Sequence, residues 1–259
     1  MVKEWITHIG EAVINTCNSV GIFTLFLIKS IRILFSKKLK VKKIIDQLEH
    51  IGVNSLPIVL LTGTFTGMVF ALQSYIGFQR VGGEQFIGAV VALGMIRELG
   101  PVLTALMVTG RAGSAIAAEI GTMRITEQID ALQTLRINPV QYLVIPRILA
   151  GTLVLPFLSI FSTMIGIIGG YFICVNILEL NGEDYINNIR TYVEMKDIIG
   201  GLIKASVFGF ILTSVGSFKG FYTTGGARGV GLSTTQSVVV GSISILISNY
   251  FLTKLLEQV

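Results

Sequence analysis

Residues 91–110 read VALGMIRELGPVLTALMVTG, an apolar run interrupted near its middle by two adjacent charges, Arg97 and Glu98. The run begins at Phe86 and ends at Gly110, and it holds no other Asp, Glu, Lys or Arg. About 20 apolar residues are enough for a helix to cross the hydrocarbon core of a bilayer. The stretch therefore predicts a membrane-spanning helix that carries two ionisable groups inside the membrane.

The rest of the chain has the composition of an integral membrane protein. Of 259 residues, 52% are hydrophobic and 14% are charged, whereas soluble domains are about one-quarter charged. Long apolar runs predict five spans, at residues 55–78, 86–110, 148–177, 198–218 and 230–253. We therefore expect an all-α polytopic membrane protein, with a five-span domain over residues 55–259 and a basic connecting segment within residues 1–54.

Residues 12–28 allow two interpretations. They carry no formal charge, yet they include four polar side chains, those of Asn15, Thr16, Asn18 and Ser19. The segment is either a sixth span or a helix in the membrane interface, and the polar residues favour the interfacial helix. We do not expect a cleaved signal peptide, because Glu4 and Glu11 precede the apolar part and the basic run KKLKVKK follows it.

The distribution of Lys and Arg predicts the orientation, because these residues accumulate in cytoplasmic loops. The segments before Ser55, after Gly110 and after Phe218 hold 14 of them, against 4 in the two other loops and the C-terminal end. The N-terminus is therefore expected in the cytoplasm and the C-terminus outside it. Because the basic residues are dispersed beside the spans and form no recognition module, we expect no nucleic-acid partner.

The chain lacks the motifs of an enzyme. It contains neither the G-x-x-x-x-G-K-[ST] motif that cradles ATP phosphates nor G-x-S-x-G. The run GGARGVGLSTT, residues 225–235, predicts a flexible loop in which Ser233 or Thr234 caps the last helix. We therefore expect no catalysis and no cofactor in this chain, and energy from another chain or an ion gradient.

Histidines and cysteines indicate no metal site and no disulfide framework. His8 and His50 are far apart and have no neighbouring ligands at metal-binding spacing. Cys17 and Cys174 both fall in apolar segments and belong to no partner motif.

The two charges inside the second span are candidates for a functional site. Arg97 lies 11 residues after Phe86, about 16 Å along a helix and close to the bilayer midplane, where a charge costs about 2.5 kcal/mol or more. Pro101 cannot donate a hydrogen bond to the carbonyl of Arg97, so a kink is predicted at the charges. Two interpretations stay open: a buried charge pair with Lys204, or a polar or amphipathic cavity lined by at least Glu98.

Small residues recur every four positions in two regions. They are Gly63, Gly67 and Ala71 in the first span, and Gly113, Ala117 and Gly121 after the second. Such faces let membrane helices approach closely, so we expect a tightly packed bundle or a dimer. Phe70, Ser74 and Phe78 form another stripe in the first span, which faces either lipid or a cavity; the spacing alone favours lipid.

The segment between the second and third spans, residues 111–147, contains a short helix pattern within TEQIDALQTLRINPVQYLVIPR. Acidic residues favour its start, a basic residue favours its end, and an Asn-Pro pair stops it; these are Glu127, Asp130, Arg136, Asn138 and Pro139. An apolar strip follows about three turns of it, through Ile129, Leu132 and Leu135. The strip either folds back on the protein's own spans or anchors a cytoplasmic partner.

Two longer motifs resemble a known family. RELGPVLTALMVTGRAGSAIAAEIGTMRITEQIDAL, residues 97–132, is followed by NPVQYLVIPR, residues 138–147. They are similar to the MlaE/YrbE permeases, the membrane subunits of MCE-type ABC transporters that move phospholipids between the inner and outer membranes of diderm bacteria. The resemblance extends from about Gly63 to Leu252. Its departures, such as Gly77 and Phe78, bear on lipid selectivity.

The resemblance implies a homodimer in the inner membrane, with five spans and an N-terminal interfacial helix in each subunit. It also implies a separate cytoplasmic ATPase that binds ATP and Mg, a periplasmic MCE-domain protein and often a STAS-domain protein. The ATPase would grip a coupling helix through Glu127, Gln128, Ile129, Asp130, Leu132, Leu135, Asn138 and Pro139. The phospholipid would occupy an outward-open cavity between subunits, lined by Arg97, Glu98, Leu99, Phe70 and Phe78.

These observations lead to three functional hypotheses. The first is a lipid-transport permease driven by a partner ATPase, which would maintain the lipid asymmetry of the outer membrane. The second is a gradient-driven secondary transporter that uses Glu98 as its proton site, although the chain lacks a convincing internal repeat. The third is a scaffold that only anchors other proteins, which leaves the charges at the midplane without a role.

Overall fold

The computed structural model describes residues 2–36, 41–80 and 82–257, and within these ranges it contains helices and no strand. Six stretches are long and apolar enough to cross a membrane: Cys17–Leu34, Val41–Phe78, Glu84–Ile125, Val140–Asn176, Met195–Phe221 and Gly226–Leu256. The predicted all-α polytopic membrane fold is therefore confirmed.

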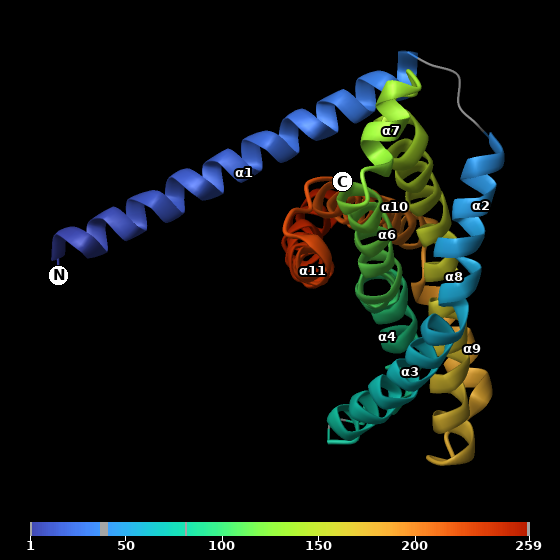
Figure 1. Cartoon of the computed structure of the whole chain (residues 1–259). Helices are drawn as coiled ribbons and strands as arrows, with labels where there is room; N and C mark the ends of the chain where they lie inside the picture. The colour runs from blue at the N-terminus through green and yellow to red at the C-terminus, as the bar shows by residue number, and fades with distance from the viewer. Residues whose placement is uncertain (1, 37–40, 81, 258–259) are drawn as a thin grey trace.

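The chain begins with α1 (Val2–Ser36), α2 (Val41–Ile51) and α3 (Leu56–Phe78). A continuous helical run follows, composed of α4 (Ile87–Gly94), η3 (Met95–Leu99), α5 (Gly100–Val108), η4 (Thr109–Gly113) and α6 (Ser114–Ile125). The remaining elements are α7 (Gln128–Thr134), η5 (Val140–Val144), α8 (Ile145–Asn176), α9 (Gly182–Tyr192), α10 (Met195–Phe221) and α11 (Gly226–Glu257). In Figure 1, α7 lies at one end of the bundle and α9 lies near the other.

Each predicted span overlaps an observed helix or helical run, but most of the predicted spans are too short at one or both ends. The second span was expected to end at residue 110, and its helical run continues to Ile125. The predicted loop over residues 225–235 is wrong, because α11 already begins at Gly226. Gly225, directly before the helix, and Gly226, its first residue, have φ of +86° and +65°. Ser233 lies in the helix with its Oγ 2.8 Å from Thr223 Oγ1.

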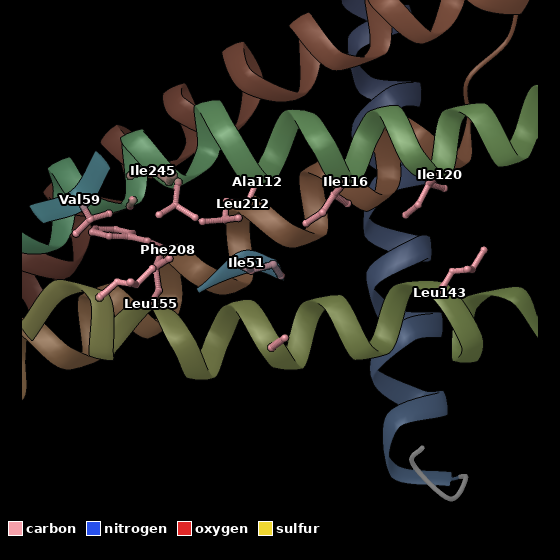
Figure 2. Close-up of a cluster of buried hydrophobic side chains, with 14 of the residues drawn as sticks. Ile51, Val59, Ala112, Ile116, Ile120, Leu143, Leu155, Phe208, Leu212 and Ile245 are labelled. Carbon is pink, nitrogen blue, oxygen red and sulfur yellow. The ribbon is translucent and has the colours of Figure 1, made fainter. Parts of the chain in front are cut away.

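One hydrophobic core joins the five helical runs that contain the predicted spans. Val59 of α3, Ile116 of α6, Leu155 of α8, Phe208 of α10 and Ile245 of α11 are fully buried members of the same cluster (Figure 2). Because each residue comes from a different span, the spans form a single packed bundle within one chain.

α1 touches this bundle through its C-terminal half. Phe26 is buried against Val144 and Ile148 at the start of the third span, and its ring also contacts those of Phe218 and Phe221 at the end of α10. From this point α1 runs away from the bundle at a steep angle (Figure 1). Its placement as an interfacial helix stays a prediction.

The small-residue faces pack between helices of the same subunit. Gly63 and Gly67 of α3 lie against Ser162 and Gly166 of α8, so that the two backbones approach closely. In the same way, Gly216 of α10 lies against the backbone of the η4–α6 run. These faces therefore stabilise the bundle, as small residues do where membrane helices cross.

We predict that Gly67→Ala lowers the stability of the bundle by about 1–3 kcal/mol, the usual effect of overpacking. An added Cβ would collide with the backbone of Gly166, which cannot rotate away. Gly77→Ala is the matched control in the same helix, because no atom of another helix lies within 4 Å of its added methyl group. Thermal unfolding in detergent would contradict this prediction if the two variants melted together.

A helix outside the spans, α9, was not predicted. Asn181 caps its N-terminus by accepting a hydrogen bond from the backbone N of Glu183 at 2.9 Å. Tyr185 is buried under the helix and donates its hydroxyl to the carbonyl of Ile167 at 3.2 Å. Burial raises the pKa of this hydroxyl. α9 thus covers the ends of the second and third spans opposite α7.

Candidate functional site

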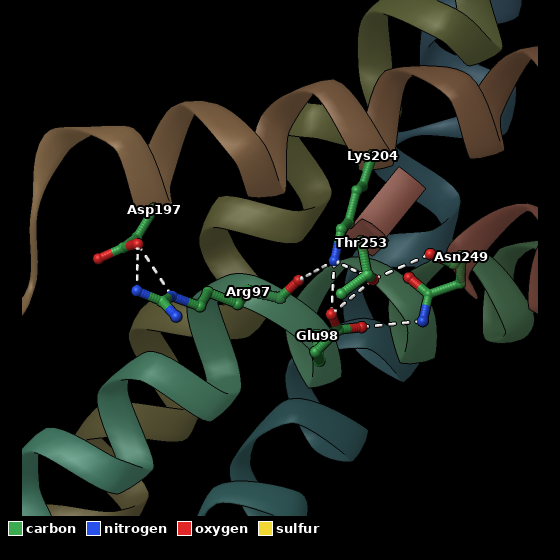
Figure 3. Close-up of polar contacts among 6 residues, drawn as sticks. All are labelled: Arg97, Glu98, Asp197, Lys204, Asn249 and Thr253. Atoms are coloured by element: carbon green, nitrogen blue, oxygen red, sulfur yellow. Dashed lines mark hydrogen bonds and ion pairs between the residues drawn. The ribbon is translucent and has the colours of Figure 1, made fainter. Parts of the chain in front are cut away.

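Arg97 and Glu98 lie in a π-helical turn, η3, within the second span. Pro101 follows at the first turn of α5, where its missing N–H leaves the carbonyl of Arg97 without its usual partner. Lys204 of α10 supplies the replacement, because its Nζ donates to this carbonyl at 3.0 Å (Figure 3). π-turns inside helices are frequently found at functional sites. The helix thus has a π-turn at the charges, and Lys204 joins this turn to the fourth span. The kink predicted there stays a prediction.

Glu98 is held by three side chains from two other spans. Lys204 Nζ lies 2.5 Å from Glu98 Oε1, and Thr253 Oγ1 lies 2.8 Å from the same oxygen. Asn249 donates its side-chain amide to Glu98 Oε2 at 2.8 Å. Lys204 has a side chain only 4% exposed, whereas that of Glu98 is 36% exposed. The predicted buried charge pair between Glu98 and Lys204 is therefore present, and Asn249 and Thr253 extend it into the last span.

Arg97 points in another direction and pairs with Asp197 at the start of α10. Its Nε and Nη2 lie 2.8 and 2.7 Å from Asp197 Oδ1. The other carboxylate oxygen, Oδ2, accepts from the backbone N of Glu194 in a capping box that begins α10. Because that box fixes Asp197, it also fixes the position of the Arg97 guanidinium, which is 40% exposed.

A polar cavity of about 470 Å³ lies beside these two ion pairs, between η3, α10 and α11. We call it the charged cavity; its lining consists of Arg97, Lys196, Asp197, Gly200, Gly201, Lys204, Thr253 and Leu256. Three cations and one carboxylate lie on its walls, and Arg97 is one of these cations. Glu98 was expected to line a polar cavity, but it is not among the residues that line this one. Its place in a cavity shared by two subunits stays a prediction.

An apolar groove of about 270 Å³ lies on the adjacent face of α10, toward α8. Ile96, Ile160, Met164, Ile167, Ile198 and Leu202 form most of its lining. Gly201 lines both the groove and the charged cavity, and its missing side chain leaves room for the carbonyl of Ile96. The charged cavity and the apolar groove therefore lie on the two sides of the contact between Gly201 of α10 and Ile96 of η3.

Leu99, Phe70 and Phe78 do not line the charged cavity. All three are partly buried against the cluster around Met95 and Tyr185. The ring of Phe70 covers Gly94, and that of Phe78 covers Gly83. The structure therefore brings Arg97 and Glu98 together with residues of α10 and α11, and it places the other three predicted residues elsewhere. Their role in a cavity shared by two subunits stays a prediction.

The predicted coupling helix exists as α7, but it is shorter than expected. It spans Gln128–Thr134, about two turns instead of three. Arg136 adopts φ of +58° and Ile137 donates its backbone N to the carbonyl of Leu132 at 2.9 Å, which ends the helix. Asn138 and Pro139 were expected to stop α7, and this is wrong.

Asn138 instead begins the next helical run. Its side chain accepts a hydrogen bond from the backbone N of Val140 at 3.0 Å, and Pro139 precedes η5 directly. Asparagine is a favoured N-cap, and proline is tolerated where the first turn needs no donor. The Asn-Pro pair therefore does mark a helix boundary, but it begins the next helical run instead of ending α7.

The apolar strip of α7 divides between the protein and the solvent. Ile129 is fully buried, and Leu132 is partly buried against the main core. Leu135 is 69% exposed. At the start of the helix, Asp130 pairs with Arg124 at 2.8 Å. The first alternative is thus confirmed for most of the strip, which folds back on the protein's own spans. The second alternative, that the strip anchors a cytoplasmic partner, stays a prediction.

A polar cluster at the C-terminal end of α2 ties this helix to the spans and was missed in the sequence. Arg111 donates from Nε to Ser55 Oγ at 2.8 Å and from Nη2 to the carbonyl of His50. Glu119 lies 3.5 Å from His50 Nε2 and 2.8 Å from Arg147 Nη2. The basic residues were counted only for orientation, and their pairing with residues 28 or more positions away left no periodic signal.

The fold and the site define a polytopic membrane protein with charged groups and a polar cavity inside its spans, which is the construction of a transport permease. Comparison with known proteins identifies the family. The chain belongs to the MlaE permease family, because the family model described as Permease MlaE matches residues 44–255.

Individual relatives agree with this assignment. A probable ABC transporter permease protein of Rickettsia conorii is 47% identical over 251 residues, which cover 97% of each chain. The intermembrane phospholipid transport system permease protein MlaE of Haemophilus influenzae is 34% identical over 99% of this chain and 98% of its own. The chloroplastic protein TRIGALACTOSYLDIACYLGLYCEROL 1 of Arabidopsis thaliana is 39% identical over 85% of this chain and 63% of its own.

Proposed function

We propose that this permease moves phospholipids between the inner and outer membranes of a diderm bacterium, and so maintains the lipid asymmetry of the outer membrane. The observation that carries the proposal is the charged cavity, which shares Gly201 with an apolar groove. A phospholipid combines a charged headgroup with apolar tails, and this pair of sites offers both environments. The name of the Haemophilus relative, an intermembrane phospholipid transport system permease protein, supports the same substrate.

In this proposal two copies of the chain form the transporter in the inner membrane. The N-terminus lies in the cytoplasm and the C-terminus in the periplasm, in line with the excess of basic residues near α1, α2 and α7. Residues from both copies then complete the cavity, including Leu99, Phe70 and Phe78. A periplasmic MCE-domain protein receives or delivers the lipid, and a STAS-domain protein binds on the cytoplasmic side.

Energy comes from a separate cytoplasmic ATPase, which binds ATP and Mg. The ATPase contacts α7 and the flanking residues 127–139, where Leu135 is exposed. Closure of the ATPase pushes α7 and, through the helices joined to it, opens or collapses the charged cavity. This differs from a gradient-driven carrier, in which Glu98 would exchange protons; Glu98 is instead held by Lys204, Asn249 and Thr253.

Purification of the chain from its native cells in mild detergent, followed by protein and lipid mass spectrometry, tests the proposal. We expect an ABC ATPase, an MCE-domain protein and bound phospholipid with the wild type. Glu98→Gln should retain less phospholipid, because the carboxylate that holds Lys204 beside the cavity is lost. Glu183→Gln is the matched control, because it removes an exposed carboxylate of α9 away from the charged cavity.

The proposal is wrong if the wild-type chain is recovered alone and without phospholipid. Uptake into ATP-free liposomes driven by a pH gradient would then support the secondary transporter.

A further inference from the structure

We infer that Lys196 and Arg97 form the phosphate-binding pair of the charged cavity, and that Glu98 and Lys204 do not contact the headgroup. This inference rests on the proposed function, because it names the chemical group of the phospholipid that the cavity recognises. Lys196 lies in the sequence beside Asp197, the residue that fixes Arg97, and both cations line the same cavity.

The hydrogen-bonding capacity of Glu98 and Lys204 is already used within the protein. Lys204 Nζ has three donors, and it contacts three acceptors: the carbonyl of Arg97 at 3.0 Å, Glu98 Oε1 at 2.5 Å and Thr253 Oγ1 at 2.7 Å. Both oxygens of Glu98 are also engaged. A headgroup would have to displace one of these contacts before it could bind here.

The guanidinium of Arg97 has N–H donors that the protein does not use. Its Nε and Nη2 are directed to Asp197, while Nη1 has no hydrogen-bond partner among the described residues. A guanidinium presents five N–H donors in a plane that matches two phosphate oxygens. Asp197 holds one edge of the guanidinium, so the remaining edge is oriented before a ligand arrives.

Lys196 supplies a second and adjustable charge at the rim. Its side chain is 70% exposed, and its Nζ lies 2.9 Å from Glu194 Oε2, which is also exposed. Exposed ion pairs of this kind contribute little stability. Lys196 can therefore leave Glu194 and turn toward a phosphate without a large loss. The fixed guanidinium of Arg97 and the mobile ammonium group of Lys196 together suit the single negative charge of a phosphodiester.

Binding of fluorescent, tail-labelled lipids to the purified complex in detergent tests the pair. The probes are phosphatidylglycerol and diacylglycerol with the same tails, and inorganic phosphate is the competitor. We expect Lys196→Gln to weaken binding of phosphatidylglycerol about fivefold, as for a partly exposed charged hydrogen bond, and to leave diacylglycerol binding unchanged. Lys196→Arg should restore the affinity, and Arg190→Gln, which removes an exposed cation of α9, should have no effect.

The possible results separate the two proposals. If wild type binds phosphatidylglycerol and Lys196→Gln binds it equally well, the phosphate-binding pair is wrong while lipid transport stands. If millimolar inorganic phosphate displaces the labelled lipid, the cavity binds free phosphate and the assignment to a lipid headgroup is overturned. If the wild-type complex binds neither lipid, the proposed function itself fails.

Discussion

Replacing Lys204 with methionine is expected to destabilise the bundle by about 3 kcal/mol, because it leaves the Glu98 carboxylate without its cation inside the membrane. Breaking a fully buried pair usually costs about 3–5 kcal/mol; Glu98 is 36% exposed, so we expect the lower end of that range. The carbonyl of Arg97 also loses the donor that replaces the missing N–H of Pro101. For a domain of this size we expect the melting temperature to fall by roughly 6–12 °C.

Two further variants show whether the ion pair between Glu98 and Lys204 is responsible for the loss of stability. Lys254→Met removes an exposed lysine one residue after Thr253 and should change the stability by less than about 0.5 kcal/mol. The double variant Glu98→Gln with Lys204→Met removes both charges and should recover much of the loss, as expected for residues in direct contact. An unchanged melting temperature for Lys204→Met alone would show that the pair does not stabilise the fold.

The spans could be predicted because their signal is local. A charge-free run of about 20 residues is unusual outside membranes, and each predicted span overlaps an observed helix or helical run. Most predicted spans were too short because a helix does not have to end at the surface of the bilayer. α6 continues to Ile125 and α11 begins at Gly226, in segments whose composition no longer differs from that of a loop.

The charged site was only half predictable. The sequence places Arg97, Glu98 and Pro101 together, and the stereochemistry of proline identifies the carbonyl that needs a new donor. Lys204 was the only other charge in a span and was therefore an obvious partner. Asp197 lies 100 positions from Arg97 and outside the predicted fourth span. No periodic pattern connects such distant residues, so the actual partner of Arg97 was missed.

Asn249 and Thr253 illustrate a second limit. Polar uncharged residues in a span usually bond to their own helix, and Thr253 does contact the carbonyl of Asn249 at 2.9 Å. Their bonds to Glu98 depend on how α11 is rotated in the bundle. Rotation is set by packing across all spans, which the sequence of one helix does not determine.

Replacing Leu135 with aspartate is expected to prevent recovery of the partner ATPase with the permease, while the permease itself stays folded. Leu135 is the exposed end of the α7 strip, whereas Ile129 is buried and Leu132 partly buried in the protein's own core. An apolar anchor that enters a partner's groove commonly contributes about 2 kcal/mol or more, so binding should weaken by about 30-fold or more. Because the side chain is exposed, the melting temperature of the isolated permease should not change.

Leu135→Met provides the matched control, because it keeps an apolar side chain of similar size at the same position. The ATPase should be recovered with wild type and Leu135→Met and lost with Leu135→Asp, and ATP-driven lipid movement should follow the same order. Equal recovery of the ATPase with all three chains would exclude Leu135 as an anchor. The partner would then have to grip the polar face of α7, where Asp130 pairs with Arg124.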